Sequence, residues 1–557
     1  MNFKKVFILT ICSVLLSMHS CDTGKIEKTD ADSPRIVNII NFIRLLEPRD
    51  AAITEDVLFE TVHQQIHQLN DYNLPATFLL QYDALINRKY QDLLKSELSA
   101  DSEIGAWWEI TQPHVEDAGM QWRGKYPWDW HANVGFATGY TPEEREQLVD
   151  VYMDKFKSVF GKYPASVGSW FIDAHTLQYM YDKYGIIASC NCKDQVGTDG
   201  YTLWGGYWNQ AYYPSKINAY MPAQTEAGQI PVPIFRMLGS DPIYQYNMGL
   251  GGRVQGVESL EPVYPRSGGN RKWVESFFKN MLEGSCLAFN YVQAGQENSF
   301  TWDAMKTGLE IQIPLLDSLR RDNKIRVETL SESGKWFKEN FPTTPATAVT
   351  AMDDVRNEGH KTVWFNSRFY RANLLWKDQN FRFRDIHLFS EKLESDYFTK
   401  AGESTQCIYK TLPVVDGFLW STREYLAGLK IVKKGVDGMM SEVLLNAPVV
   451  DEPEKGMLSV KCLDDAGNLF IISFREDKFE VSCEAKEKDL SWMLEMRAAP
   501  NATLPFQVIA EKEIKASQDG FEYTIVAEQG TFDREDGAAF RIMPSDNVIV
   551  INCNTAR

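Results

Sequence analysis

The sequence predicts an α/β domain, built as a parallel sheet or barrel, followed by a domain made of β-strands. In the amino-terminal half, apolar runs of strand length alternate with amphipathic helical stretches, which is the pattern of βαβ units. In the carboxyl-terminal half, short alternating runs are separated by Asp, Gly and Asn turns, which is the pattern of an antiparallel sandwich. The chain has 557 residues, enough for two such domains.

The first elements are a strand, a helix and a second strand. Residues 36–43 (IVNIINFI) form a nearly continuous β-branched run, as expected of a strand that is buried on both faces. Apolar residues at helical spacing follow between positions 57 and 69. The run LPATFLL at 74–80 then predicts the next buried strand.

The later elements of this domain continue the alternation. Thr141-Pro142-Glu143-Glu144 offers an N-cap, a proline in the first turn and a glutamate at the third helical position, which predicts a helix that ends at Gly161. Further strands are predicted at 166–172, 231–238 and 287–292, and further helices at 177–184 and 302–319.

The composition changes near residues 341–345 (FPTTP). Beyond this point the runs at 458–463, 469–474 and 548–552 alternate in hydropathy, as half-buried strands do. We therefore predict a barrel domain at 35–343 and a β-rich accessory domain at 344–557.

The net charge excludes one class of partner. Acidic residues outnumber basic ones and give a formal charge of −18 at pH 7. Nucleic-acid binding needs clustered Lys and Arg to neutralise phosphates. Nucleic acid is therefore not expected as a main partner.

The amino terminus predicts export. Lys4 and Lys5 precede an apolar run at 6–18, which is too short to span a bilayer but suits a secretory signal. The next residues end in Ser20-Cys21, which resembles a bacterial lipobox with Cys21 as the acylated residue. We expect a signal peptide at 1–21, a polar tether at 22–34, and a lipid anchor in the bacterial cell envelope, in the outer membrane facing the periplasm or the surface. An ordinary signal peptide with an incidental cysteine is the alternative.

Five acidic residues come where predicted strands end. Active sites of α/β barrels lie at the carboxyl ends of the strands, and glycosidic cleavage needs one carboxyl group as acid and a second as nucleophile or base. Each residue alone could instead cap the helix behind it, and Asp241, which precedes Pro242, fits that alternative best. The five residues are Glu47, Glu109, Asp173, Asp241 and Glu297.

Aromatic residues gather in the loops that follow these strands, where barrels bind substrate. Flat aromatic faces stack on sugar rings, while polar groups bind the hydroxyls; packing between loops is the alternative. Arg44 and Arg49 could bind an acidic sugar or pair with neighbouring carboxylates. His131 and His175 are expected to hydrogen-bond to substrate or to neighbours rather than to bind metal. The aromatic candidates are Trp107, Trp128, Trp130, Trp204, Tyr207 and Trp208.

Three segments, taken in order, resemble the polysaccharide deacetylase (NodB-like) superfamily. They are Leu74-Pro-Ala-Thr-Phe-Leu79, Glu103-Ile-Gly105, and the block from Thr141 to Asp173 that contains Gly161-Lys-Tyr-Pro164. The resemblance implies a distorted (β/α)7 barrel that acts on carbohydrate. Members of that superfamily bind metal through an Asp-Asp pair at the end of a strand and an HxxxH pair after the Glu-Ile-Gly strand. Both pairs are missing here. We therefore expect no metal and no cofactor.

The segment Trp170-Phe-Ile-Asp173-Ala-His175 resembles a block of the related glycoside hydrolases of families 38 and 57. This resemblance places Asp173 at the nucleophile and Glu297, on the last predicted strand, at the acid. The sequence therefore predicts a metal-independent glycoside hydrolase acting on an oligosaccharide or polysaccharide. A carbohydrate esterase of the deacetylase type and a non-catalytic glycan-binding lipoprotein are the alternatives.

Overall fold

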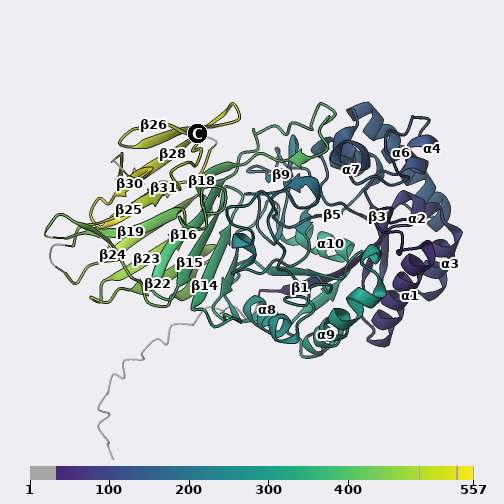
Figure 1. The fold of residues 1–557 in the computed structure, drawn as a ribbon, viewed down its shortest axis with the longest axis horizontal. Coiled ribbons are helices and arrows are strands. Elements are labelled where there is room, and N and C mark those ends of the chain that lie inside the picture. The colour runs from purple at the N-terminus through teal and green to yellow at the C-terminus, as the bar shows by residue number, and fades with distance from the viewer. Residues whose placement is uncertain (1–32, 436, 488–489, 535–536, 556–557) are drawn as a thin grey trace, which may run out of the picture.

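The computed structural model describes residues 33–555 except 436, 488–489 and 535–536. Cys21, the predicted signal peptide and nearly all of the predicted tether lie outside the described residues. A helix-containing part is followed by a part made of strands (Figure 1). In the described ranges, no helix combines the length and apolar character needed to cross a bilayer.

The helix-containing part is built on a parallel sheet that curls into a distorted barrel. Among the described residues, seven parallel strands follow one another in the order β11-β1-β2-β3-β4-β5-β10. Their bounds are β1 Arg35–Ile43, β2 Thr77–Leu80, β3 Glu103–Trp107, β4 Ser166–Gly168, β5 Ala188–Asn191, β10 Ile234–Arg236 and β11 Asn290–Ala294. Strand β1 pairs with β11, β12 and β2 and is buried over almost its whole length, as its continuous apolar run predicts.

The barrel is not closed by a complete backbone ladder. The described strands β10 and β11 are neighbours but do not pair. A side chain spans the gap instead, because Leu238 N donates to Gln293 Oε1 at 2.6 Å. Strand β7 (Ala211–Tyr212) extends the sheet antiparallel to β10, and β12 (Arg326–Glu328) pairs with β1.

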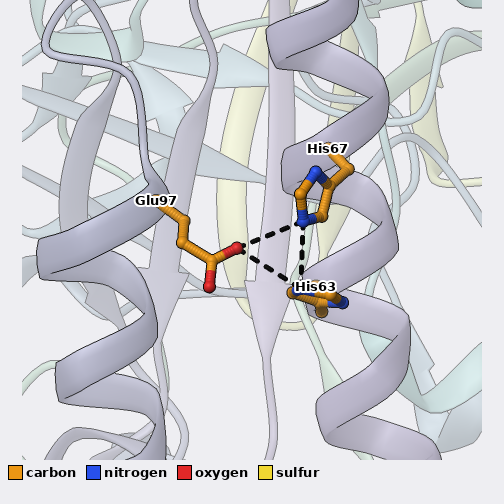
Figure 2. A group of neighbouring side chains, drawn as sticks. All are labelled: His63, His67 and Glu97. Carbon is orange, nitrogen blue, oxygen red and sulfur yellow. Dashed lines mark hydrogen bonds and ion pairs between the residues drawn. The ribbon is translucent and has the colours of Figure 1, made fainter.

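Helices cover the outside of the sheet. The predicted helix after Thr141 is α6, and it has the expected capping box with Glu144 and a left-handed Gly161 at its end. Helices α1 and α3 pack side by side, which brings Glu97 against His63 and His67 (Figure 2). The helices are α1 Glu55–Asp71, α2 Tyr82–Ile86, α3 Arg88–Glu97, α4 Gln112–Asp117, α5 Ala132–Gly135, α6 Pro142–Phe160, α7 Ala174–Tyr184, α8 Arg271–Glu283, α9 Trp302–Arg321 and α10 Leu330–Asn340.

The carboxyl-terminal part is a sandwich of two antiparallel sheets, as predicted. One runs β13-β14-β15-β16-β19-β25-β30-β29, with β18 beside β16 and β20 beside β19, and the other runs β21-β22-β23-β24-β31-β28-β27-β26. Their inner faces meet, since Phe365 stacks on Phe474 with ring centroids 5.2 Å apart. The first sheet comprises β13 Thr347–Ala351, β14 His360–Asn366, β15 Tyr370–Lys377, β16 Asn380–Leu388, β18 Leu412–Asp416, β19 Gly428–Lys434, β20 Met440–Glu442, β25 Trp492–Arg497, β29 Thr531–Asp533 and β30 Phe540–Met543. The second comprises β21 Val449–Glu454, β22 Met457–Leu463, β23 Leu469–Phe474, β24 Lys478–Glu484, β26 Phe506–Ile509, β27 Glu513–Gln518, β28 Phe521–Gln529 and β31 Val548–Asn552.

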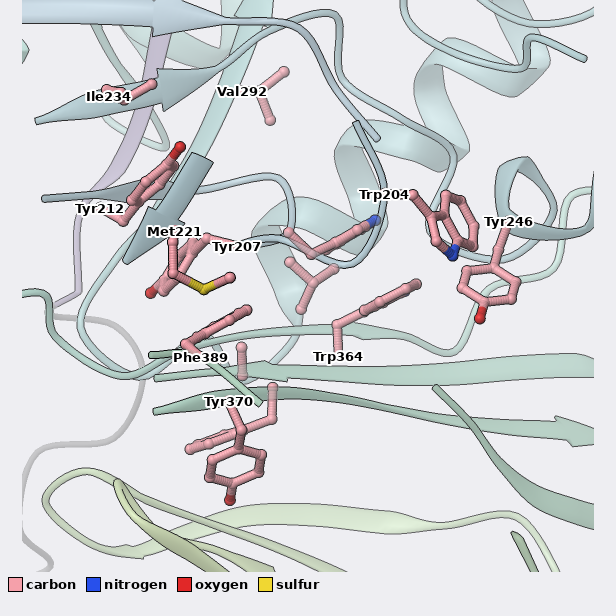
Figure 3. Close-up of a cluster of buried hydrophobic side chains, with 14 of the residues drawn as sticks. Trp204, Tyr207, Tyr212, Met221, Ile234, Tyr246, Val292, Trp364, Tyr370 and Phe389 are labelled. Atoms are coloured by element: carbon pink, nitrogen blue, oxygen red, sulfur yellow. The ribbon is translucent and has the colours of Figure 1, made fainter. Parts of the chain in front are cut away.

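Aromatic residues join the two parts (Figure 3). The Trp208 ring lies flat on Trp364 of β14, with centroids 4.2 Å apart and 3° between planes. Trp204 Nε1 donates to Asp416 at 2.9 Å, and the Tyr207 hydroxyl lies 2.8 Å from Thr347 Oγ1. These three aromatic residues are at most 5% exposed. The prediction that they bind substrate is wrong, because the same flat apolar faces are buried against the first sheet of the sandwich.

A buried ionic network supports this junction. Asp194, which follows β5, pairs with Arg236 at 2.7 Å and with Arg371 of β15. Arg371 also donates to both oxygens of Asp385, at 2.8 and 2.9 Å. The loop between β16 and β18 then returns to the barrel, where β17 (Cys407–Ile408) pairs with β6 (Tyr201–Thr202). The remaining short strands, β8 (Pro214–Ser215) and β9 (Asn218–Pro222), form a small hairpin.

Candidate active site

A cavity of about 760 Å³ opens at the carboxyl ends of the barrel strands. Its walls come from the loops that follow β1, β3, β5, β10 and β11, and from one loop of the carboxyl-terminal part. The lining includes the charged, polar and aromatic residues described below, which are Arg44, Glu47, Arg49, Glu109, Trp128, Trp130, His131, Lys193, Glu261, Glu297, Ser299, Thr405 and Gln406.

Arg44 is at the centre of the charged wall. Its Nε and Nη2 donate to the two oxygens of Glu109 at 2.9 and 2.7 Å, and its Nη1 lies 2.7 Å from Glu297 Oε2. Gln81 Nε2 donates to Glu109 at 2.7 Å. The Glu109 side chain is fully buried and all its bonds serve Arg44 and Gln81. Glu109 is therefore a positioning residue, and the predicted catalytic role does not fit its contacts.

Glu297 has the surroundings of a general acid. It follows β11, and its side chain is 5% exposed. Burial raises its pKa to about 7, while the charge of Arg44 and the 2.6 Å hydrogen bond from Ser299 act in the opposite direction. A carboxyl group with such a pKa retains a proton at neutral pH often enough to donate it.

Glu47 is the complementary group in the same cavity. Burial disfavours its charge, but Arg49 donates to both its oxygens, at 2.7 and 2.5 Å, and Arg44 adds a second positive charge. Together the two arginines outweigh burial and lower the pKa of Glu47. At neutral pH this group is an ionised carboxylate.

A third carboxylate is tied to a lysine. Lys193, just after β5, donates to Glu261 Oε1 at 2.7 Å, and Gln296 donates to Glu261 Oε2 at 2.8 Å. The sequence analysis missed both residues of this pair. The charge of Lys193 immediately after the uncharged run 185–192 (GIIASCNC) was the available signal, whereas Glu261 lies in a loop that shows no pattern.

Aromatic rings pack against the arginines of the charged wall. The guanidinium carbon of Arg44 lies 4.2 Å from the Trp128 ring centroid, and that of Arg49 lies 5.0 Å from the same ring. His131 Nδ1 is 2.6 Å from Asp129 Oδ1, which fixes the imidazole beside Trp130. The structure thus brings predicted residues Trp128, Trp130 and His131 into one cavity with Arg44, Glu47, Arg49, Glu109 and Glu297.

Asp173 lies elsewhere, which corrects the prediction that it is the nucleophile. It caps α7, where its Oδ1 accepts from Thr176 N at 2.9 Å and its Oδ2 accepts from Thr176 Oγ1 at 2.6 Å. Arg145 Nη1 donates to it at 2.9 Å, and both side chains are fully buried. With both oxygens bonded and no part in the cavity wall, it has no path to a substrate.

Three further predictions are corrected. Asp241 bonds to the backbone N–H groups of Ile243 and Tyr244 and to Trp273 Nε1, and so orders its own loop. Trp107 stacks on Phe42 inside the barrel, at 4.1 Å between centroids. His175 pairs with Glu146 on the outside of α7 and α6. None of the three predicted site residues is part of the cavity lining.

The residues of this cavity do not fit the metal site of the deacetylases that the sequence resembles. A catalytic metal of that kind needs imidazole and carboxylate donors around one point. Here the Arg44 guanidinium lies between Glu109 and Glu297, and the one imidazole of the lining is bonded to Asp129. We therefore derive no step through a metal in this cavity.

Comparison with known proteins gives structural matches. No known family profile matches the sequence, and no curated protein matches it. The chain is similar to a proposed glycoside hydrolase/deacetylase from Parabacteroides distasonis, with 15% identity and a TM-score of 0.49 over 67% of this chain and 89% of that one. A proposed polysaccharide deacetylase from Mycobacterium smegmatis (10% identity, TM-score 0.35, 57% and 95% covered) and a cobalt-bound family 4 acetyl xylan esterase from Clostridium thermocellum (11%, 0.25, 56% and 94%) are also similar. Each of these three structures shares at most 15% identity with the chain, and their TM-scores are all below 0.5.

Proposed function

We propose that this chain is a glycoside hydrolase that uses Glu297 as its general acid and Glu47 as its ionised carboxylate. The observation that carries the proposal is that one cavity contains two carboxyl groups whose pKa values are shifted in opposite directions. Such a pair divides the acid role and the base or nucleophile role between two residues of the same type.

The remaining residues of the cavity fit a sugar ring. Trp130, which is half-buried, offers a flat face for the apolar side of a pyranose. Lys193, Glu261 and Arg49 offer charged hydrogen-bonding groups for its hydroxyls. Trp128 is buried under the two arginines and supports them from behind. A volume of about 760 Å³ suits a short segment of an oligosaccharide.

In the proposed reaction Glu297 donates its proton to the glycosidic oxygen as the bond to the leaving sugar breaks. The Glu297 carboxylate that remains is stabilised by Arg44, whose Nη1 is already 2.7 Å away. Glu47 either attacks the anomeric carbon or activates the water that does so. Arg49 keeps Glu47 charged until that step.

The test is hydrolysis by the full chain of a panel of oligosaccharides and aryl glycosides. Glu47→Gln should lower turnover on all substrates by at least about 1000-fold. Glu297→Gln should lower it most for sugar leaving groups and much less for a nitrophenol, which needs little protonation. Glu103→Gln is the matched control, because Glu103 is half-buried at the opposite end of β3, away from the cavity, and accepts hydrogen bonds from Ser166 and Ser331.

The same assays separate the alternatives. Release of acetate from acetylated glycans, with no cleavage between sugars, would favour the esterase and contradict the proposal. Tight glycan binding without any product would favour the non-catalytic lipoprotein. Wild-type turnover in Glu47→Gln on a confirmed substrate would contradict the assignment of this residue.

A further inference from the structure

A second cluster of chemistry-bearing side chains lies on the outer surface of the barrel. His63 and His67 are four residues apart on α1, and Glu97 is the last residue of α3 (Figure 2). Among the described residues, this is the one group of three or more His, Cys, Asp or Glu side chains whose donor atoms could surround an ion. It does not contribute to the cavity lining.

Three donor atoms converge on one point. His63 Nε2 and His67 Nε2 are 3.0 Å apart, and Glu97 Oε2 lies 3.3 Å from the first and 3.2 Å from the second. In a tetrahedral zinc site with bonds of about 2.0–2.1 Å, the ligand atoms lie about 3.3–3.4 Å from one another. The three observed separations therefore match one face of such a site with little movement.

Hydrogen bonds among His63 Nε2, His67 Nε2 and Glu97 Oε2 cannot pair all three atoms well. Each neutral imidazole has one N–H, and at least one of the two facing nitrogen atoms must act as an acceptor. If the Nε2–H of one ring donates to the Nε2 of the other, the second nitrogen has no proton to give to Glu97 Oε2. If both Nε2 atoms are unprotonated, the two nitrogen atoms and the carboxylate can bind one cation together. The donor set of two imidazoles and one carboxylate is the set that favours Zn²⁺ and its neighbours over Mg²⁺ or Ca²⁺.

The surroundings hold the ligands in place. Asn70 Nδ2 donates to the backbone oxygen of Glu97 at 2.8 Å, which ties α1 to the end of α3. Phe59 and Tyr90 pack between the same helices, with ring centroids 5.4 Å apart. Glu60 lies one turn before His63 with a carboxylate oxygen 3.8 Å from its Nδ1, within a small movement of the hydrogen bond that orients metal-binding imidazoles.

We propose that His63, His67 and Glu97 bind one divalent transition-metal ion of the Zn²⁺ class. The side chains are 32%, 54% and 36% exposed, so the ion reaches the site from solvent and keeps at least one coordination position for water. The bound ion links α1 to α3 and stabilises the folded barrel, because it binds three groups that are far apart in the unfolded chain.

The test is calorimetric titration of the untagged full chain with ZnCl2 at about pH 7.5, where imidazole is mostly neutral. We expect one Zn²⁺ per chain and a higher melting temperature with Zn²⁺ than with EDTA. His63→Gln and His67→Gln should each weaken this binding by at least about 100-fold and abolish the melting shift. His175→Gln is the matched control, because it removes a single imidazole that pairs with the half-exposed Glu146.

Cobalt gives an independent readout. Co²⁺ bound by the wild-type chain should show visible absorption bands of a low-coordinate nitrogen and oxygen site, and both histidine variants should lose them. Unchanged Zn²⁺ affinity in His63→Gln and His67→Gln, or no binding of Zn²⁺ or Co²⁺ by the wild-type chain, would overturn the proposal. Mg²⁺ and Ca²⁺ should neither bind nor raise the melting temperature.

Discussion

Glu297 and Glu47 line the same cavity, yet their neighbours give them different protonation states. Ser299 donates a hydrogen bond to Glu297, and Arg44 pairs with it. Burial outweighs both and raises the pKa of Glu297. Two arginines act on Glu47, one of them through two hydrogen bonds, and they outweigh burial. Arg49 also acts on Glu297 by its charge, but it hydrogen-bonds to Glu47, and the negative charge of Glu109 adds to burial at Glu297. At the scale of single residues, the direct hydrogen bonds from Arg49 and the nearby Glu109 therefore separate the two carboxyl groups.

This difference predicts the pH dependence of kcat/KM. Activity should fall as pH rises above about 7, because Glu297 loses the proton that it must donate. It should fall on the acid side only below the usual range of a glutamate, because the pKa of Glu47 is lowered. Profiles measured on an oligosaccharide, whose leaving group needs the proton, should lose the alkaline limb in Glu297→Gln at its lower residual rate and keep it in Glu103→Gln. An unchanged alkaline limb in Glu297→Gln would assign the proton to another group.

Arg44 is predicted to matter for stability as well as for catalysis. Removing it in Arg44→Met leaves Glu109 buried without its cation, and breaking such a pair costs about 3–5 kcal/mol. The double variant Arg44→Met/Glu109→Leu should recover part of that loss, because no uncompensated charge then remains in this pair. Denaturant unfolding measures both. Arg88→Met, in a largely exposed pair with Asp92, should change the free energy of unfolding by less than about 1 kcal/mol.

At the scale of elements, the amino terminus of α7 shows how one acidic residue can order several segments. Asp173 caps the helix and pairs with Arg145 of α6. Arg145 also donates to the backbone oxygens of Ala137, Tyr140, Tyr397 and Lys400. Two helices and a loop of the carboxyl-terminal part therefore depend on this pair.

Asp173→Asn should consequently act on stability and leave catalysis intact. It keeps a side-chain oxygen for the cap but removes the charge opposite a fully buried guanidinium, at a cost of about 3–5 kcal/mol. Turnover per folded molecule should stay near the wild-type value. Thermal unfolding and active-fraction kinetics check both statements, with exposed Asp182→Asn as the control. A nucleophile would give the opposite result, with normal stability and no turnover.

The sequence predicted many elements but could not separate roles that share one local pattern. An acidic residue between a strand and a helix is the pattern of an N-cap and of a barrel nucleophile alike, so Asp173 and Glu297 looked equivalent. Aromatic loop residues likewise suit a cavity wall or a domain junction, and Trp128 lines the cavity whereas Trp208 lies in the junction. His63 and His67 gave a visible four-residue spacing, but their partner Glu97 becomes apparent only when α1 and α3 pack together.

At the scale of the whole molecule, the buried ionic network makes the junction sensitive to pH. Burial disfavours the charge of His387, but the charge of Asp385 outweighs it and raises the pKa. The pKa of Asp385 is lowered, because Arg371 and His387 outweigh its burial. A raised histidine pKa gives stability below about pH 6.5 that is lost as pH rises through the folded value. A lowered aspartate pKa gives stability above about pH 3.9 that is lost as pH falls through the folded value.

The junction should therefore be most stable between about pH 4 and 6.5. Melting temperatures of the wild-type chain should decline as the pH rises above that range. His387→Gln should flatten this decline, whereas His175→Gln should leave it unchanged. A decline of the same size in His387→Gln would mean that another group carries the alkaline dependence.

The anchoring of the molecule is a separate prediction. Because Cys21 ends a segment that resembles a lipobox, Cys21→Ser should move the protein out of the membrane fraction of its host. Labelling with a fatty-acid analogue should be lost at the same time. A mutation of the neighbouring Ser20→Ala, which keeps a small residue before the cysteine, is the control and should leave both unchanged.

The loop that carries Thr405 and Gln406 belongs to the carboxyl-terminal part but forms some of the wall of the barrel cavity. Two distant stretches of the gene therefore encode the wall of one pocket. Recombination near the end of the barrel would transfer only part of that pocket, so the two stretches are expected to be inherited together. For the proposed hydrolase, a change of preferred substrate is then expected from mutations in this loop, with every residue of the barrel unaltered.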